Sequence, residues 1–371
     1  MNTPEVRLVR KSRSNGLVLL FNFGLIAATL ICYLCNYISP KDIGYLVLLG
    51  LGYPVIVLLH FVFLLYWFFK KKRLMWWSGL TLLLGLAHLT DVVQINFTKT
   101  LKEGEKELKV LTWNVHLFGL YNWENNVKTR NAMFDVLNAE QADVLCFQEF
   151  YHSDERGLFP TRDTLITFLP TTYYHQRYTH SPRHNQYFGV IIFSRYPIVG
   201  RGDIPFQGDA NNYCIYADLK IGSDTVRVYN AHLQSIRFGK DDYAFVQENQ
   251  KKEDIKQGAF RIMRKLRRAF VRREDQVEKV VQHITSCPHK VILCGDFNDP
   301  PHSYTYERFS DVLRDSFLDA GNGLGNTFNH PAFPPLRIDY ILHSEGMRAH
   351  EYTTLREDLS DHFPVVAQIA W

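Results

Sequence analysis

The chain has 371 residues, of which 46% are hydrophobic and 22% are charged, an ordinary composition for a folded protein that excludes disordered and collagen-like chains. Its 42 basic and 38 acidic residues leave a net charge of +4, which is too weak over this length to indicate nucleic-acid binding. Residues 16–87 are almost entirely apolar, whereas the chain from Lys99 onward is mixed. The sequence therefore predicts a membrane-anchored protein with a separate globular part.

Three apolar runs predict an N-terminal membrane anchor over residues 1–98. Residues 16–38 carry no charged side chain and can cross about 30 Å of hydrocarbon as a helix. Residues 43–69 form a second uncharged run. Residues 74–97 form a shorter third run that continues past Asp91. We therefore predict three transmembrane helices, followed by a Lys/Glu-rich linker at 99–108.

Basic residues in short loops predict the orientation of this anchor, because they favour the cytoplasmic side. The basic N-terminal tail with Arg7, Arg10 and Lys11 and the cluster at 70–73 both favour that side. Three spans in a plasma or inner membrane then leave the globular part outside the cytoplasm. The lysines of the linker, however, favour the opposite side. A cleaved signal peptide is the alternative for the first run, but the run is long and further apolar segments follow it.

The second part, residues 109–371, alternates strand-like and helical patterns. Helices are predicted at 125–142 and over a long stretch that ends near Thr285, where apolar residues recur at helical spacing. Two groups of strands separated by helices favour an α/β fold with two sheets packed face to face and helices outside. Apolar runs predict strands at 108–113, 143–147, 189–193, 213–219, 225–231, 290–294, 338–342 and 365–369.

Polar residues follow or close nearly every predicted strand, and strand ends at one sheet edge are where rigid scaffolds gather catalytic side chains. Hard oxygen ligands without cysteine favour Mg²⁺, Mn²⁺ or Ca²⁺ over Zn²⁺. Such an ion, together with imidazoles and amides, is suited to in-line attack of water on phosphorus. The residues in question are Asn114, Glu149, His232, Asp296, Asn298, Asp339, Asp361 and His362.

The segments that carry these residues form an ordered set of six motifs. They are LTWNV at 111–115, QE at 148–149, NAHLQS at 230–235, GDFN at 295–298, RIDYI at 337–341 and SDHFPV at 360–365. This set resembles the endonuclease/exonuclease/phosphatase superfamily, to which deoxyribonuclease I, AP endonucleases, neutral sphingomyelinases and inositol polyphosphate 5-phosphatases belong. The resemblance covers residues 109–371 and implies a four-layered α/β sandwich.

The resemblance also implies a metal site for Mg²⁺, with Mn²⁺ or Ca²⁺ possible. Glu149 is then the principal metal ligand, and Asn114 and Asp361 complete or support the site. Taken alone, Asn114 is equally consistent with an ordinary turn residue, and Asp361 with a solvated loop residue.

The same resemblance implies catalytic roles for five residues. Asp296 orients or deprotonates the attacking water, and Asn298 holds a phosphate oxygen. His362, braced by Asp339, contacts the scissile phosphate, and His232 contacts it from the other side. Taken singly, Asp296 and Asn298 could be cap or turn residues and each histidine a structural one. In isolation, Asp339 would most simply be an ion-pair partner of Arg337.

The motifs narrow the substrate without identifying it. A histidine at position 232 disfavours the AP endonucleases, and the segment around Asp339 lacks the pattern of the 5-phosphatases. We therefore predict a nuclease-like phosphodiesterase. The alternatives are a sphingomyelinase-like phospholipid phosphodiesterase, a phosphatase, and a catalytically inactive binding module of the same fold.

A basic helical insertion over about 240–273 adds a prediction about partners. Apolar residues line one face of this segment, so it could rest on anionic lipid headgroups. It could equally follow a nucleic-acid backbone, or it could be a packed helix with a solvated basic face. The residues proposed to contact headgroups are Arg261, Arg264, Lys265, Arg267 and Arg268.

Overall fold

The computed structural model describes most of the chain. Arg7, Arg10 and Lys11, which contribute to the predicted orientation, lie outside the described residues, as does most of the predicted insertion before residue 252. The described residues are 13–97, 99–122, 125–155, 159–180, 185–208, 211–239, 241–242, 245, 252–331, 333 and 335–371.

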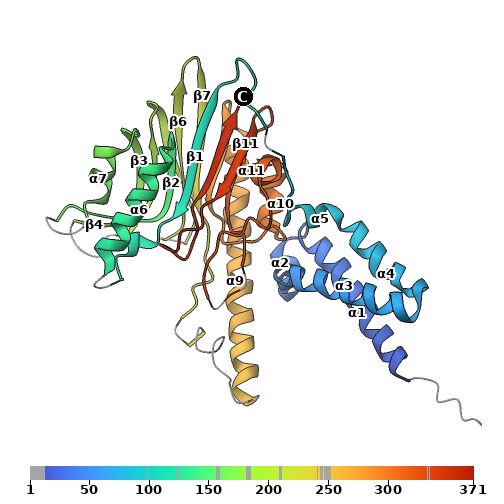
Figure 1. Ribbon diagram of the computed structural model, residues 1–371. Coiled ribbons are helices and arrows are strands. Elements are labelled where there is room, and N and C mark those ends of the chain that lie inside the picture. The colour runs from blue at the N-terminus through green and yellow to red at the C-terminus, as the bar shows by residue number, and fades with distance from the viewer. Residues whose placement is uncertain are drawn as a thin grey trace, which may run out of the picture.

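Two six-stranded mixed sheets form the centre of the globular part in the described residues (Figure 1). The first sheet has the order β11-β12-β1-β2-β4-β3 and the second β5-β6-β7-β8-β10-β9. The first contains β1 (Glu107–Asn114), β2 (Val144–Ser153), β3 (Tyr173–His180), β4 (Gln186–Ser194), β11 (Arg348–Thr354) and β12 (Val365–Ala370). The second contains β5 (Ile198–Pro205), β6 (Tyr213–Ile221), β7 (Asp224–His232), β8 (Lys290–Asp296), β9 (Arg314–Asp315) and β10 (Asp339–His343).

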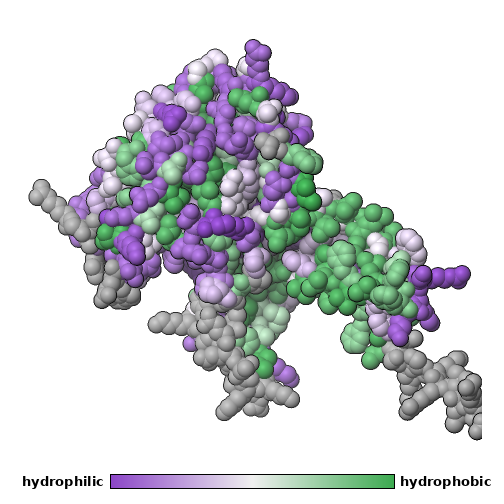
Figure 2. Space-filling model, viewed as in Figure 1, coloured by the Kyte–Doolittle hydropathy of each residue, from purple (hydrophilic) through white to green (hydrophobic). Residues whose placement is uncertain are grey.

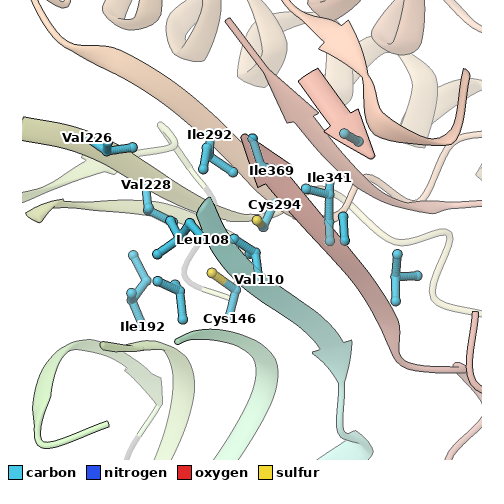
Figure 3. Packing of buried hydrophobic residues seen from close by; sticks show 14 of the residues in the cluster. Leu108, Val110, Cys146, Ile192, Val226, Val228, Ile292, Cys294, Ile341 and Ile369 are labelled. Atoms are coloured by element: carbon cyan, nitrogen blue, oxygen red, sulfur yellow. The ribbon is translucent and has the colours of Figure 1, made fainter. Parts of the chain in front are cut away.

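Apolar residues from the facing sides of both sheets make the central core (Figure 3). Val110 and Cys146 of the first sheet and Val228 and Cys294 of the second are fully buried there. Because strand side chains alternate in direction, the same strands also bury residues against helices on the outer faces. The sandwich has four layers, as predicted.

Helices cover the outer face of each sheet. Helices α6 (Asn126–Glu140) and α7 (Thr161–Phe168) pack on the first sheet, and α9 (Lys252–Thr285) and α10 (Tyr304–Ser310) pack on the second. The predicted apolar spacing near the end of α9 is confirmed by the burial of Val277, Val280, Val281 and Ile284. Two short elements complete the domain, the 3₁₀ turn η2 (His116–Gly119) and α11 (Ser316–Ala320).

The N-terminal part is a bundle of helices beside the domain (Figure 1). Its segments 16–35 and 40–70 are each long and apolar enough to cross a membrane. In Figure 1, α2 and α5 lie next to the domain, and the turn between α3 and α4 lies at the opposite end of the bundle. The bundle consists of α1 (Arg13–Cys35), α2 (Pro40–Ile43), η1 (Gly44–Gly52), α3 (Tyr53–Lys70), α4 (Lys72–Leu84) and α5 (Leu86–Thr90).

The third predicted span, 74–97, is wrong at its C-terminal end. Helix α4 ends before Gly85, where an added Cβ would lie 1.9 Å from the hydroxyl of Tyr33 and would displace that side chain. Helix α5 then ends at Thr90. The backbone of Gln94 pairs instead with Gly323 of the domain, and the side chain of Asn96 donates to the carbonyl of Gly321 at 2.9 Å. Hydrogen bonds to the domain therefore replace the end of the predicted helix.

The surface of the bundle is apolar and its interior holds the polar side chains, the reverse of a soluble helical bundle. Asn22 accepts from the indole of Trp67 at 2.9 Å, and Thr29 lies 2.8 Å from His60. Large apolar side chains such as Leu20 and Phe69 are 69% and 75% exposed. Figure 2 shows this apolar surface as a continuous green belt over the bundle. Polar contacts inside and apolar groups outside are the arrangement that a lipid environment favours.

Candidate active site

The predicted site residues meet at one edge of the sandwich because of the strand directions. Strands β1 and β2 are parallel, as are β7 and β8, so their C-terminal ends lie side by side. Asn114 is in register with Gln148, and His232 is in register with Asp296. The antiparallel strand β10 begins opposite Asp296 with Asp339. We call this edge of the two sheets the catalytic edge, after the roles that the sequence predicts for its residues.

A buried triad of Asp296, Asp339 and His362 forms the centre of this edge. His362 Nδ1 lies 2.9 Å from Asp339 Oδ2, and His362 Nε2 lies 3.9 Å from Asp296 Oδ2. Potential ligand atoms of all three lie within 4.8 Å of one another. Burial alone would lower the pKa of His362, but the carboxylates of Asp339 and Asp296 outweigh it and raise that pKa to about 10. The imidazole is therefore a cation at neutral pH.

Burial acts on Asp296 in the opposite direction. Its carboxyl is 1% exposed, and this desolvation raises its pKa to about 6, against the attraction of His362 and His232. The side-chain amide of Asn114 donates to Asp296 Oδ2 at 3.0 Å, and the backbone N–H of Asn298 donates to Oδ1 at 2.8 Å. The carboxylate is thus held in a fixed position with a pKa near neutrality.

Glu149 and His232 line the open side of the site. Glu149 Oε1 lies 3.4 Å from Asn114 Nδ2 and 3.9 Å from His232 Nε2, and His232 Nε2 lies 3.7 Å from Asp296 Oδ2. His232 Nε2 is buried without a hydrogen-bond partner. Such an atom at a site of buried carboxylates is a position where a ligand is expected.

Two site residues have left-handed backbones, which non-glycine residues rarely adopt. Glu149 has φ +49° inside β2, where the pairing with β4 shifts register, and Asn298 has φ +55° just after β8. The side-chain amide of Asn298 donates to the carbonyl of Leu233 at 3.0 Å and to Asp296 at 3.2 Å. Strained backbone held by specific hydrogen bonds is typical of functional sites.

A buried polar pair joins the two sheets directly beneath the site. Gln148 Nε2 donates to Asn230 Oδ1 at 2.7 Å, and the amide of Asn230 donates to the carbonyls of Phe147 and Ile191 at 2.9 Å each. Gln148 directly precedes the site residue Glu149, and Asn230 lies two residues before the site residue His232. The hydrogen bond between Gln148 and Asn230 therefore fixes the distance between the site residues of the first sheet and those of the second.

Asp361 lies beside this group rather than within it. In the described part of the chain, its side-chain hydrogen bonds and ion pairs are with Ser360 at 3.3 Å and His116 at 3.4 Å. Ser360 in turn donates to the backbone carbonyl of Asn114 at 2.9 Å. Asp361 is thus linked to the site through the backbone of a predicted metal ligand.

Sequence reasoning missed two residues at this edge, His116 and Arg237. His116 follows Asn114 by two residues, and that proximity was the available signal. Both line clefts that flank the site: one of about 230 Å³ contains His116 and Asp361, and one of about 280 Å³ contains Arg237, Glu149 and His232. Arg237 also donates to Asn212 at 3.3 Å.

Asp339 does not pair with Arg337, which was the simplest alternative to its predicted role. Arg337 pairs with Asp315 at 2.5 Å, and both side chains are buried. This leaves Asp339 Oδ2 to His362, and Asp339 Oδ1 is buried without a hydrogen-bond partner. The geometry is that of a carboxylate that orients the ring of His362 and stabilises its positive charge.

The donor set fits a hard divalent cation. Among the described residues, the ion pairs of Glu149 and Asp296 are with histidines and none is with a lysine or arginine. Burying a carboxylate such as that of Asp296 is costly unless paired charges or a metal ion offset the cost, and the side chain of Glu149 is 37% exposed and open to a ligand. Oxygen donors without cysteine match Mg²⁺, Mn²⁺ or Ca²⁺.

The fold and the site define a class of protein in which two packed sheets present carboxylate, amide and imidazole groups at one edge. The chain belongs to the endonuclease/exonuclease/phosphatase family, whose model matches residues 111–362. A second model, for a domain of unknown function, matches residues 15–92, which correspond to the helical bundle. No curated protein matches the chain.

Solved structures share this fold at low sequence identity. An endonuclease/exonuclease/phosphatase from Beutenbergia cavernae has a TM-score of 0.52 and 18% identity, with 71% of each chain covered. A family protein from Leptotrichia buccalis has a TM-score of 0.51 and 18% identity over 70% of this chain and 98% of its own. Sphingomyelinase C from Streptomyces griseocarneus has a TM-score of 0.50 and 21% identity over 71% of this chain and 99% of its own. At these identities the likeness concerns the fold alone.

Proposed function

We propose that the protein is a membrane-anchored hydrolase that cleaves phosphate ester bonds with a divalent metal ion. The observation that carries this proposal is the convergence, from both sheets, of Glu149, Asn114, Asp296, His232 and His362 on one edge. Membership of the family supports phosphate esters as the substrates. An inactive binding module is disfavoured because every predicted site residue is present.

The metal site is proposed at Glu149 and Asn114, with Asp361 as a supporting residue. Mg²⁺ is the first candidate, and Mn²⁺ and Ca²⁺ share its preference for oxygen ligands. When bound, the cation would neutralise the charge that develops on the phosphoryl oxygens.

The chain's own residues supply the proton transfer and the hydrogen bonds. Asp296 orients the attacking water and accepts its proton, for which a pKa raised by burial to about 6 suits neutral pH. His362, kept protonated by Asp339, donates a hydrogen bond to a phosphate oxygen. His232 does so from the other side, and Asn298 holds a further oxygen.

Two substrate classes share this chemistry, nucleic acid and phospholipid, and the placement of the site favours phospholipid over the nuclease-like activity. Strand β1 starts near the C-terminus in Figure 1 and runs away from it, so the catalytic edge lies on the side where α9 and the bundle project. His302, six residues after Asp296, contacts Tyr53 of the bundle with ring centroids 3.6 Å apart. A site so close to a bilayer would meet lipid headgroups directly.

Helix α9 supports the same substrate class, with fewer free cations than the sequence predicted. Arg261 and Lys265 share one partner, Asp242, at 2.9 and 2.5 Å, so this single carboxylate offsets half of their combined charge. Arg264, Arg267 and Arg268 remain candidates for anionic headgroups. The exposed side chains of Phe260 and Met263 on the same half of the helix could enter the interface.

The orientation is proposed from the bundle and the basic residues together. The short helix α2 contains Lys41, which pairs with Glu274 of the domain, so α2 and the domain lie at the same end of the bundle. The cluster at 70–73 belongs to the turn at the other end. The preference of basic residues for the cytoplasmic side then leaves the domain on the extracytoplasmic side of the membrane.

The test is hydrolysis by the full chain in detergent or lipid nanodiscs. We expect turnover of a bis-aryl phosphate with Mg²⁺ or Mn²⁺, abolished by EDTA and by Asp296→Ala, and retained by Lys106→Ala, a remote control. Absence of turnover with every divalent ion would overturn the proposal in favour of a binding module. Parallel assays on phospholipid vesicles, DNA and RNA at physiological salt decide the substrate, and a preference for nucleic acid would overturn the lipid assignment.

A further inference from the structure

The loop between β8 and α10 connects the catalytic edge to the helical bundle. It leaves β8 at Asp296, carries Asn298 and reaches His302 before α10 begins. His302 is only 4% exposed. Its ring lies 3.6 Å from that of Tyr53 and 5.4 Å from that of His88, measured between centroids. A residue of the catalytic loop is therefore seated among the residues of the bundle.

The backbone of this loop also touches the bundle. A Cβ placed on Gly50 of η1 would lie 2.3 Å from the carbonyl oxygen of His302, closer than any real Cβ contact. The backbones at Gly50 and His302 approach each other so closely that no side chain fits between them. Because the contact is with backbone, the loop cannot adapt by rotating a side chain.

A second route joins the bundle to the same loop through α9. Ser39 Oγ donates to Glu274 at 2.8 Å, and Lys41 Nζ contacts Asp275 at 2.6 Å. The neighbouring Arg273, whose side chain is 1% exposed, pairs with Asp299 at 3.1 Å. Arg273 also donates to the carbonyl oxygens of Asn298 and, at 3.2 Å, of Gln234.

The contacts of Arg273 converge on the two segments that hold Asp296 and His232. Gln234 follows His232 by two residues, and Asn298 follows Asp296 by two residues. A buried guanidinium with several donors in a fixed plane holds its acceptors at set distances. Arg273 is thus a brace between two catalytic segments, and Glu274 beside it is tied to the bundle.

We propose that the docked helical bundle positions the catalytic loop, with Arg273 and His302 as positioning residues, so that turnover depends on the bundle as well as on the domain. This inference rests on the proposed function for its activity readout. Its physical basis is that a displacement of a catalytic group by about 1 Å can cost about 100-fold in rate. A membrane anchor that only tethered the domain would have no such effect.

Gly50→Ala in the full chain in nanodiscs is the test, because it pushes the bundle against the loop without touching a site residue. Gly52→Ala is the matched control, since its Cβ would meet only Ile56 of the bundle, at an ordinary 3.9 Å. We expect Gly50→Ala to lower kcat by about 10- to 100-fold. The KM and the affinity for Mn²⁺ stay close to those of the wild type, because Glu149 and Asn114 lie on other strands. Gly52→Ala keeps the wild-type kcat.

Hydrogen exchange of residues 296–303 separates this inference from the proposed function. We expect faster exchange of this segment in Gly50→Ala than in Gly52→Ala, whether or not a substrate has been found. Unchanged exchange and unchanged kcat in folded Gly50→Ala would overturn the coupling. A wild-type protein without any activity would overturn the proposed function alone.

Arg273 provides an independent test within the domain. We expect Arg273→Met to lower kcat per folded molecule with little change in KM, and Arg273→Lys to restore part of the loss. A merely structural role would lower the melting temperature and the yield of folded protein but leave kcat per folded molecule unchanged. That result would overturn the assignment of Arg273 as a positioning residue.

Discussion

The two ends of the sandwich use carboxylates in opposite ways. At the end near the C-terminus, Asp224 pairs with Lys106 at 2.9 Å and accepts from the indole of Trp371 at 2.8 Å, at the surface. At the catalytic edge, Asp296 and Asp339 are buried and have histidines as their charged partners. Paired surface carboxylates contribute little to stability, whereas the desolvation of buried charges opposes stability even when a partner offsets part of the cost. The costly arrangement is therefore the one that requires a function.

The pKa values of two aspartates express the same contrast. Hydrogen bonds from Lys106 and Trp371 lower the pKa of Asp224 to about 2. Burial raises the pKa of Asp296 to about 6. The end near the C-terminus thus stabilises the charged form of Asp224, whereas the catalytic edge favours the protonated form of Asp296 more than water does.

The largest effect is expected from Asp296→Asn. Loss of the proposed general base should reduce turnover by about 1,000-fold, within the range known for general acid–base catalysis. Its unfolding free energy should stay unchanged or rise, because a buried charge is removed. Turnover of a bis-aryl phosphate and thermal unfolding measure the two quantities. A strong loss of stability would contradict the view that this edge is not built for stability.

A buried ion pair away from the catalytic edge should behave in the opposite way. Arg337→Met leaves the carboxylate of Asp315 buried without its partner, and we expect a loss of about 3–5 kcal/mol in unfolding free energy. Denaturant titration measures it. The double variant Arg337→Met/Asp315→Leu should recover much of the lost unfolding free energy. If Arg337→Met were as stable as the wild type, this buried ion pair would not differ from the catalytic edge in its effect on stability.

Metal binding should depend on the catalytic edge alone. Glu149→Gln should weaken Mn²⁺ binding by about 100-fold, and the stabilisation by metal, about 2.7 kcal/mol at 100 times the Kd, should shrink accordingly. Titration calorimetry with Mn²⁺ measures the affinity. Glu105→Gln, which removes a surface partner of Arg348 at the opposite end, is the control and should bind Mn²⁺ like the wild type.

The smallest effect is expected from Asp224→Asn. The folded-state pKa of Asp224 is lowered from the ordinary 3.8 to about 2. Its charge therefore stabilises the fold above pH 3.8, and this contribution is lost as the pH falls through about 2. The wild type should melt slightly above Asp224→Asn at neutral pH, and the difference should close at low pH. Melting curves between pH 7 and pH 2 test this, and a difference that widens on acidification would have the wrong sign.

The central strands could be predicted from the sequence, but the edge strands could not. Strands β1, β2, β7 and β8 are rich in apolar residues because most of their positions are buried on both faces. Strands β3, β5, β9 and β11 were missed. They are the four edge strands of the two sheets, where residues such as those of β5 alternate between half-buried and exposed positions.

The helical bundle shows a similar division. The first two apolar runs were long enough to be recognised, and the structure has candidate membrane-crossing segments at both. The third run ends earlier than predicted because Gly85 interrupts the helix and the domain captures the segment around Gln94. Neither the close crossing of Tyr33 nor the pairing with Gly323 is visible in the local sequence.

The sequence by itself predicted which residues would form the candidate site, because carboxylates, amides and imidazoles that follow buried strands can be recognised from their order along the chain. Only the tertiary structure decided which partners these groups have. It paired Asp339 with His362 and Arg337 with Asp315, and it brought Arg273 of α9 against the loop that follows β8. The reason is physical: the presence of a buried strand follows from local pattern, whereas strand direction and the partner of a buried charge depend on contacts between segments far apart in the chain.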